Sequence, residues 1–339
     1  MSKLYLATGD GPIIVTPHGD CWRATRPLEV RSASCVVADP LEPRRVVCTT
    51  ARDGVWRSDD AGVNWRPVFQ GIPHDRVTAV AVSPVERVGE LGVIYVGTEP
   101  SAVFRSEDGG ETWHACEGLT DLPSSSDWHF PPRPETHHVR WIGSDPHQPG
   151  RLFVAIEAGA LVRSPDGGAT WQDRVPGGPY DTHQLVTHPD APDRLWSAAG
   201  DGFFESDDGG ETWRHAEQGL HHRYCWSVAV SPQDPQTVVL SAAAGPRQAH
   251  DADQAEAHLY RRAGEDAAWQ EVREGLPEPE GVRAYALAAD RVETGIFYAG
   301  SAGAVYRSSD AGTSWEQLPV EWPAGYAGSR VHVMTAVHA

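Results

Sequence analysis

Short apolar runs alternate with turn-forming residues along the whole chain. Each repeating unit starts with an apolar run that ends in a small turn residue, as in VTAVAVSP, SVAVSP and SCVVADP. A second run follows, as in VIYVGT, RLFVAI, TVVLSA and GIFYAG, and then a shorter third run, as in AVFRS, ALVRS, GFFES and AVYRS. Runs of this length that are rich in β-branched and aromatic residues predict β-strands.

The third run of each unit leads into one repeated motif, S-x-D-x-G-x-x-W. Five clear copies are SDDAGVNW, SEDGGETW, SPDGGATW, SDDGGETW and SSDAGTSW, and two weaker copies are TPHGDCW and RAGEDAAW. The tryptophans that end the seven copies lie 42–58 residues apart, at Trp22, Trp65, Trp113, Trp171, Trp213, Trp269 and Trp315. A fourth strand begins at each tryptophan, and four strands per repeat at this spacing are typical of propeller blades.

The pattern predicts an all-β fold, a seven-bladed β-propeller of four-stranded antiparallel blades, as one domain over residues 1–339. The chain starts with the pattern of a second strand, LYLATG, and ends with RVHVMTAV, which has the pattern of a first strand. We therefore expect the C-terminal strand to complete the N-terminal blade, which removes the open sheet edge.

Composition excludes several classes of function. Lys and Arg number 28 against 47 Asp and Glu, a formal net charge of −19, which argues against nucleic-acid and anionic-membrane surfaces. The five cysteines have no zinc-site spacing, and we expect reduced thiols. The N-terminus lacks a signal-peptide core, and no apolar run approaches a transmembrane length. We expect a cytoplasmic protein, a monomer, with no nucleic-acid or membrane partner.

The repeated motif has a mechanical explanation. Its Ser and Asp accept hydrogen bonds from turn N–H groups, its Gly adopts a positive φ, and its Trp packs between sheets. Five equivalent acids around a ring do not share one reaction centre. We therefore interpret the motif carboxylates as structural rather than catalytic: Asp60, Asp108, Asp166, Asp208 and Asp310.

The motif copies resemble the BNR (Asp-box) repeat proteins, and the resemblance covers nearly the whole chain. That family includes sialidases, xyloglucan-cleaving glycosidases, sortilin-type receptors and photosystem assembly factors. Sialidases have six blades and an N-terminal Arg-Ile-Pro signature, whereas this chain reads LATGDGPIIV there. The resemblance implies a propeller whose first strands line the channel. Ligands usually bind on the face that carries the loops before the first strands and between the second and third strands, which we call the loop face. The Asp-box turns lie on the other face.

Alignment of the first strands gives two columns of residues that point to the same side. The first column reads Ser32, Arg76, His138, Asp181, Tyr224, Arg283 and Arg330, and the second reads Ser34, Thr78, Arg140, His183, Trp226, Tyr285 and His332. The positions between the columns are almost all small or apolar. We therefore predict a polar channel mouth whose ligand-binding residues are Arg76, Arg140, Tyr224, Trp226, Arg283, Tyr285 and His332.

Carboxylates from the loops between second and third strands join this face: Asp53, Glu99, Glu157 and Asp201. Glu99 and Glu157 occupy equivalent positions in adjacent blades. With His138 and His183, they are candidates for general acid and base, as in glycoside hydrolysis. The alternative is that the two glutamates are ion-pair partners of Arg76 and Arg140.

Two insertions fall on the loop face, residues 119–138 before a first strand and residues 242–258 between a second and a third strand. Long loops on one face are often lids or binding loops, the alternative being tolerated insertions. We predict no cofactor. A divalent metal remains open, through converging imidazoles of His138, His183 and His332.

These observations leave three hypotheses for function. The first is a propeller that binds a small polar or anionic ligand, bearing a carboxylate or a sugar, at the channel mouth. The second is a glycoside hydrolase or lyase that acts on a glycan or glycoside at the same place, rather than a true sialidase. The third is a scaffold that binds a protein partner.

Overall fold

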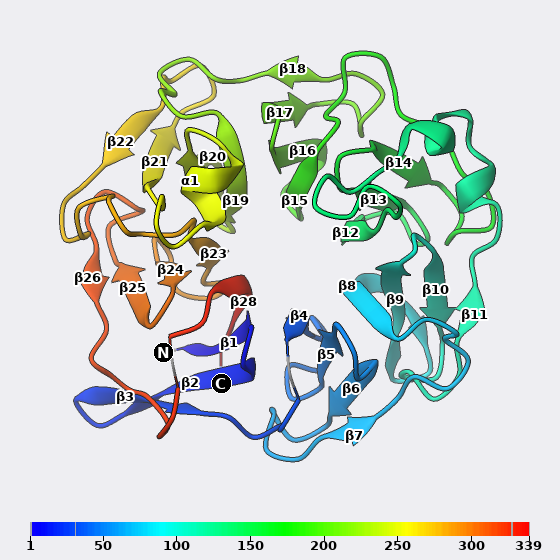
Figure 1. Cartoon of the computed structure of the whole chain (residues 1–339), viewed down its shortest axis with the longest axis horizontal. Helices are drawn as coiled ribbons and strands as arrows, with labels where there is room; N and C mark the ends of the chain where they lie inside the picture. The colour runs from blue at the N-terminus through cyan, green and yellow to red at the C-terminus, as the bar shows by residue number, and fades with distance from the viewer. Residues whose placement is uncertain (1, 31, 327, 339) are drawn as a thin grey trace.

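The computed structural model describes residues 2–30, 32–326 and 328–338. Seven sheets are arranged in a ring, with their innermost strands facing the centre (Figure 1). The fold is nearly all β, as the repeat pattern predicts. Among the described residues, no helix is both long and apolar enough to span a membrane.

The first blade closes the ring. It contains β1 (Ser2–Thr8), β2 (Gly11–His18), β3 (Cys21–Thr25) and the last strand of the chain, β28 (Val331–His338). Strand β28 pairs antiparallel with β1 from Ser2↔His338 to Thr8↔Val331, which confirms the expected closure. A short fifth strand that the pattern did not predict, β27 (Val320–Glu321), runs parallel to β3 at the outer edge.

The other blades follow in chain order around the ring (Figure 1). Blade two has β4 (Ala33–Ala38), β5 (Val46–Thr50), β6 (Val55–Ser58) and β7 (Arg66–Pro67). Blade three has β8 (Arg76–Val88), β9 (Leu91–Glu99), β10 (Val103–Ser106) and β11 (His114–Ala115). Blade four has β12 (Val139–Ser144), β13 (Leu152–Ile156) and β14 (Ala160–Ser164), and its outer strand is reduced to a bridge between Arg163 and Gln172.

Blade five has β15 (Thr182–His188), β16 (Ala191–Ala199), β17 (Gly202–Ser206) and β18 (Arg214–His215). Blade six has β19 (Tyr224–Ser231), β20 (Asp234–Ala243), β21 (Ala257–Ala263) and β22 (Gln270–Val272). Blade seven has β23 (Ala286–Ala289), β24 (Phe297–Ser301), β25 (Ala304–Ser308) and β26 (Glu316–Gln317). The insertions hold three short helices, η1 (Leu119–Asp121), η2 (Pro123–Asp127) and α1 (Pro246–His250).

The Asp-box turns are built as hydrogen-bonded hairpins. In blade five, Ser206 donates to Asp208 (2.8 Å) and accepts the N–H of Gly210 (2.8 Å). Asp208 also accepts the N–H and hydroxyl of Thr212, at 2.9 and 2.6 Å. Gly210 has φ +83°, which a side chain rarely adopts. The box acids are therefore fully engaged in turn geometry, as expected.

The box tryptophans pack between blades. Trp113 of blade three donates its ring N–H to the carbonyl of Val68, which follows blade two, at 2.7 Å. Trp269 of blade six makes the same contact with Ala216 at 2.7 Å. Apolar clusters accordingly run across neighbouring blades, so each sheet buries one face on the next.

Substitution Asp208→Ala removes three hydrogen bonds from an exposed turn, and we expect it to lower the free energy of unfolding by about 1–2 kcal/mol. The matched control is Asp207→Ala, because Asp207 is the adjacent acid and its half-exposed carboxylate forms ion pairs with Arg194, which is 12% exposed, and with Arg214. We expect the control to cost less than about 1 kcal/mol. Urea denaturation measures both, and equal effects would contradict a structural role for the box.

Candidate functional site

Cavities lie at both ends of the central channel. One, of about 590 Å³, is lined by the starts of the inner strands together with the loop-face insertions. The other, of about 530 Å³, is lined by the far ends of the same strands and is mainly apolar, with Val36, Val82 and Val230 among its residues. A cavity of only about 10 Å³, lined by Arg140, His183, Trp226 and His332 among others, lies between them, and we call it the constriction. The first cavity, which is lined by charged side chains such as Arg76 and Glu99, is the channel mouth.

Most of the predicted site residues line this mouth. From the candidate sets they are Arg76, Arg140, Tyr224, Trp226, His332, His138, Glu99 and Glu157, and from the rest of the two columns Ser32, Ser34, Thr78, Asp181 and Arg330. These side chains come from blades two to six and the closing strand of blade one, so the aligned columns lie together around one cavity.

Three predicted residues do not line the mouth cavity. Arg283 and Tyr285 precede β23, which begins at Ala286, and Tyr285 is 2% exposed and packs edge-on against Tyr306. His183 is fully buried below Tyr224 and Trp226, where its Nδ1 lies 2.7 Å from the carbonyl oxygen of Cys225. The pairing of Ala286 with Gly300 matches that of Ser227 with Ser241 in blade six, so the alignment is in register in blade seven too, but Tyr285 packs onto Tyr306 instead of lining the cavity.

Both insertions supply residues to the mouth. The 119–138 insertion contributes Phe130 and Arg133, and the 242–258 insertion contributes Pro246 and His250 from α1. The sequence indicated that these loops lie on the functional face. It carried no signal for which of their residues reach the cavity.

Glu157 is held by cationic neighbours. Its Oε2 lies 2.9 Å from Nε2 of His138 and 3.5 Å from Nε of Arg140. Burial by itself raises the pKa of this carboxyl, but the neighbouring His138, His183 and Arg140 outweigh burial and bring that pKa well below its usual range. Glu157 is therefore an anion at neutral pH.

Glu99 is likewise engaged in ion pairs. Arg133 donates two hydrogen bonds to its carboxylate, at 3.0 and 2.6 Å, and Nε of Arg76 lies 3.7 Å from its Oε2. The Arg133 guanidinium also lies over the ring of Phe130, which in turn packs edge-on against His138. Both ion pairs left open by the sequence, Arg76 with Glu99 and Arg140 with Glu157, are formed.

Two arginines gather on Trp226. The guanidinium carbon of Arg140 lies 4.7 Å from the ring centroid, and that of Arg330 lies 4.1 Å from it. Among the described residues, Nε and Nη2 of Arg330 and the ring N–H of Trp226 have no hydrogen-bond partner. Burial and the charge of Arg140 lower the pKa of Arg330 to about 10, so it remains a cation at neutral pH.

A chain of hydrogen-bonding side chains extends from the mouth into the constriction. The hydroxyl oxygen of Tyr224 lies 3.0 Å from Nε2 of His250 and 3.3 Å from Nε2 of His183. Burial and Arg330 lower the pKa of His250 to about 3, and burial raises the pKa of Tyr224 above its usual range. Both side chains therefore act as uncharged hydrogen-bonding groups at neutral pH.

The potential metal ligands at the mouth differ from those expected. Atoms of Glu157, Asp181 and His183 lie within 4.8 Å of one another. Within the described part of the chain, the expected trio of His138, His183 and His332 does not form such a group. Burial, together with Glu157, raises the pKa of Asp181.

Sequence comparison bears on the repeat itself. The family model described as BNR/Asp-box repeat matches residues 204–215, which contain the box of blade five. This seven-bladed propeller therefore contains a BNR/Asp-box repeat. A curated relative, a xyloglucanase from Paenibacillus sp, is 24% identical over 274 residues, which are 77% of this propeller and 23% of the relative. The propeller therefore spans about a quarter of that relative's length.

Solved structures share the fold. An ancestral GH74 enzyme aligns with a TM-score of 0.65 and 18% identity over 90% of this propeller and 38% of that chain. YCF48 from Cyanidioschyzon merolae aligns with a TM-score of 0.59 and 15% identity over 88% of this propeller and 86% of that chain. A structure described as YCF48 bound to D1 peptide aligns with a TM-score of 0.57 and 17% identity, covering 84% of each chain. At these identities the similarity establishes the fold alone.

Acid pH should destabilise the mouth through His332. Burial, with Arg330 and Arg140 nearby, lowers the pKa of His332 to about 3, whereas an unfolded histidine takes up a proton near pH 6.5. The unfolded state therefore binds more protons between these values, and stability falls as pH drops below about 6.5, by up to about 1.4 kcal/mol per pH unit.

We expect His332→Gln to reduce the slope of stability against pH between about pH 6.5 and 5.5. At lower pH the raised pKa of Asp181 makes stability rise as pH falls, which opposes the effect of His332. The exposed His221 supplies the control, His221→Gln. The measurement is the free energy of unfolding at several pH values. If His332→Gln leaves the slope unchanged, the imidazole of His332 is charged in the folded wild-type protein, which contradicts the prediction.

Proposed function

We propose that this propeller binds a small carboxylate-bearing ligand, such as an acidic sugar, at the channel mouth. The observation that carries the proposal is Arg330, a cation with two N–H-bearing nitrogens that lack a hydrogen-bond partner within the described residues, beside a second cation, Arg140. Two like charges on one indole repel each other, and an anion between or beside them offsets that repulsion.

The surroundings of Arg330 favour a ligand with a flat or apolar face. Tyr224 and Phe130 line the mouth and are partly exposed, and aromatic faces stack on sugar rings and other planar groups. Tyr224 and His250 add neutral hydrogen-bonding groups. The cavity of about 590 Å³ is in the range of small-molecule sites.

The two glutamates at the mouth fit this role as supports. Glu157 and Glu99 each face arginine or histidine and so neutralise Arg76, Arg133 and His138. That leaves Arg330 as the cation at the mouth for which no ion pair is formed within the described residues. A ligand carboxylate would therefore be directed to one side of the cavity, next to Trp226.

Glucuronate, a simple sugar carboxylate, tests the proposal. We expect Arg330→Gln to weaken its binding about 10–100-fold, the worth of a charge-assisted hydrogen bond. Arg23→Gln is the matched control, because Arg23 lies on the outer strand β3, is about half exposed and does not line the cavity. Isothermal titration calorimetry gives both affinities, with circular dichroism to show that both variants fold. An equal loss of glucuronate affinity in the two variants would contradict the proposal, because it would show a general effect of positive charge rather than a contact with Arg330.

A second candidate is glycoside hydrolysis, which the similarity to a xyloglucanase favours. Asp181 and Glu157 have pKa values that are shifted in opposite directions, up for Asp181 and down for Glu157. Such divergence is the pattern of a general acid paired with an anionic base or nucleophile. In this role Asp181, rather than Glu99, partners Glu157, because Glu99 is engaged by Arg133 and Arg76.

The enzyme hypothesis predicts turnover of aryl glycosides, aryl uronides or xyloglucan fragments. We expect Asp181→Asn to reduce such turnover by at least about 100-fold, because the neutral amide does not deliver a proton. Release of the chromophoric aglycone is the measurement. Absence of turnover on the whole panel by the wild-type protein would remove this candidate and leave the binding role intact.

The scaffold hypothesis has support from one structural neighbour, a propeller of the same fold described as bound to a peptide. A peptide with a C-terminal or side-chain carboxylate would meet the same Arg330. If the propeller binds such peptides and not glucuronate in the same calorimetric experiment, the anion is a protein partner's carboxylate rather than a sugar's.

A further inference from the structure

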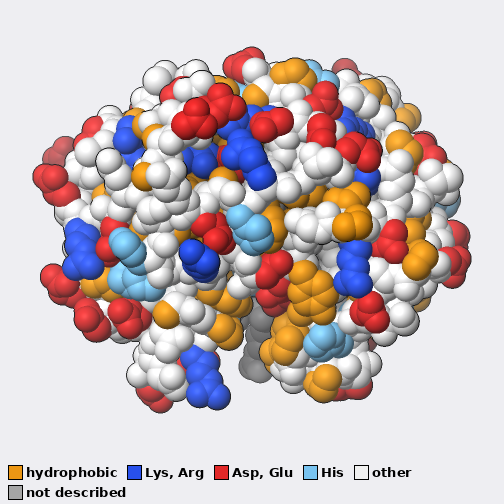
Figure 2. All heavy atoms as spheres, turned by 90° about the horizontal axis from the view of Figure 1, so that it is seen from above, with side chains coloured by type: hydrophobic (Ala, Val, Ile, Leu, Met, Phe, Trp, Pro, Cys, Tyr) orange, Lys and Arg blue, Asp and Glu red, His pale blue; other side chains and the backbone are white. Residues whose placement is uncertain are grey.

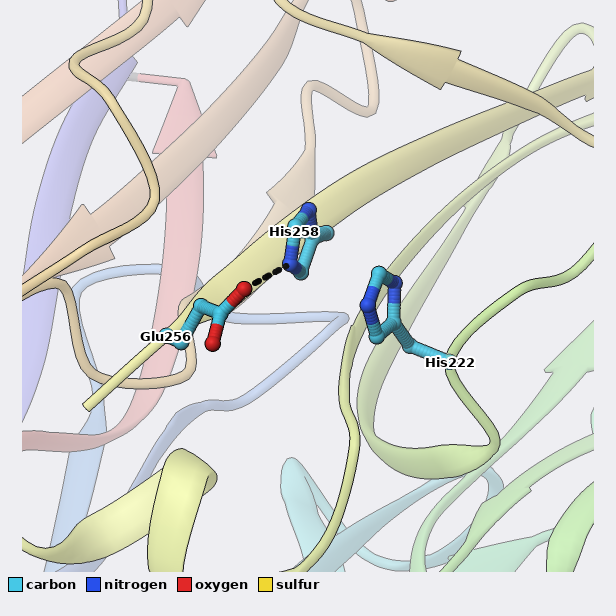
Figure 3. Close-up of side chains that lie close together, drawn as sticks. All are labelled: His222, Glu256 and His258. Atoms are coloured by element: carbon cyan, nitrogen blue, oxygen red, sulfur yellow. Dashed lines mark ion pairs between the residues drawn. The ribbon is translucent and has the colours of Figure 1, made fainter. Parts of the chain in front are cut away.

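A second cluster of metal-ligating side chains lies in blade six, apart from the residues that line the mouth. It consists of His222, from the loop between β18 and β19, Glu256, at the end of the 242–258 insertion, and His258 on β21 (Figure 3). One potential ligand atom from each lies within 4.8 Å of the other two. Two segments that are distant in sequence thus bring two imidazoles and a carboxylate together.

Each imidazole has one nitrogen committed elsewhere. Nδ1 of His258 lies 2.8 Å from Oε1 of Glu271, and Nδ1 of His222 lies 2.6 Å from the hydroxyl oxygen of Tyr260. An outer carboxylate or hydroxyl on one ring nitrogen is the arrangement that orients metal-bound histidines, because it fixes the tautomer that leaves the other nitrogen free to ligate. Here it leaves Nε2 of both rings.

The free nitrogen of His258 is buried and unsatisfied. The side chain is 4% exposed, and its Nε2 has no hydrogen-bond partner among the described residues. The nearest acidic oxygen, Oε1 of Glu256, is 3.6 Å away, which is too long for a hydrogen bond. Two ligands of a tetrahedral zinc ion, each about 2.1 Å from it, are about 3.4 Å apart. The observed gap is close to that separation.

The two rings require a small adjustment. His222 and His258 stack with centroids 3.7 Å apart and an angle of 10° between planes. In-plane lone pairs of parallel rings do not meet at one point, so one ring must turn for both to bind one ion. His222 is the ring that can turn, because it lies on a loop and is only half-buried, whereas His258 is enclosed within β21. The turn breaks the contact of its Nδ1 with Tyr260, so the outer partner that stays in place is Glu271 on His258.

We propose that His222, Glu256 and His258 form a binding site for a divalent transition-metal ion of the zinc type. Three protein ligands would leave a fourth position open to solvent, on the side where Glu256 is exposed. The two nitrogen ligands favour zinc over magnesium or calcium, which prefer oxygen ligands alone.

Such an ion would couple to the channel mouth through the insertion. Glu256 donates its backbone N–H to the carbonyl of Gln248 in α1 (2.9 Å), and α1 carries His250, which lines the mouth. The ion would join the end of the insertion to β21 and to the loop before β19. It would therefore restrain the segment that positions His250.

The test uses the full chain without a histidine tag. Equilibrium dialysis against Zn²⁺, read by mass spectrometry of the metal, gives the stoichiometry, and competition with a chromophoric chelator gives the affinity. We expect one tightly bound zinc per chain. Glu271→Gln, which alters only the positioning of His258, should weaken zinc binding by roughly 10–100-fold. His222→Gln and His258→Gln each remove a ligand and should weaken zinc binding by more than that. Circular dichroism shows whether each variant folds.

His221→Gln is the matched control, because His221 is exposed, adjacent in sequence and outside the cluster. It should leave zinc affinity unchanged. The absence of a stoichiometric zinc ion, or binding that persists in both His222→Gln and His258→Gln, would overturn the proposal. Zinc that is lost in Glu157→Gln but retained in His222→Gln would place the ion at the mouth instead, and would overturn it equally. Glucuronate affinity is measured separately, so failure of the zinc site does not decide the mouth's function.

Discussion

The antiparallel pairing of β28 with β1 closes the ring, and the arrangement of the channel depends on that pairing. A sheet with one unpaired inner strand would leave an open edge and would release the circular packing of blade on blade. The closing strand also takes part in the site. Arg330 directly precedes its first residue, Val331, and His332 lies on the strand itself. The same segment therefore closes the ring and supplies a cation of the mouth, so the site is complete only when the ring is closed.

Electrostatics at the mouth run against the character of the whole protein. The chain has a formal net charge of −19, yet Arg76, Arg140, Arg133 and Arg330 converge on one cavity. Glu99 and Glu157 neutralise part of that charge through ion pairs, and the remaining cation lies against Trp226. Acidic side chains are spread over the side of the molecule that Figure 2 shows. Such a surface disfavours large polyanions, so a small anion is the ligand that fits both features.

Much of this arrangement could be predicted from the sequence because strand alternation is regular. The box tryptophans indicate the number of blades, and the alternation of the inner strands then predicts that Arg140, Tyr224, Trp226 and His332 face the channel. The prediction failed for side chains whose packing the alternation does not set. In blade seven the column is in register, but Tyr285 packs against Tyr306, and neither it nor Arg283 lines the cavity. Arg133 and His250 reach the site from the two insertions, which do not follow the repeat.

The central claim is that the mouth binds an anion through Arg330. A crystal structure of the protein in saturating glucuronate tests it most directly. The account predicts the carboxylate within hydrogen-bond distance of the Arg330 guanidinium, with the sugar ring against Tyr224 or Phe130. Glucuronate bound elsewhere on the propeller, or a mouth that remains free of it at saturation, would contradict the account.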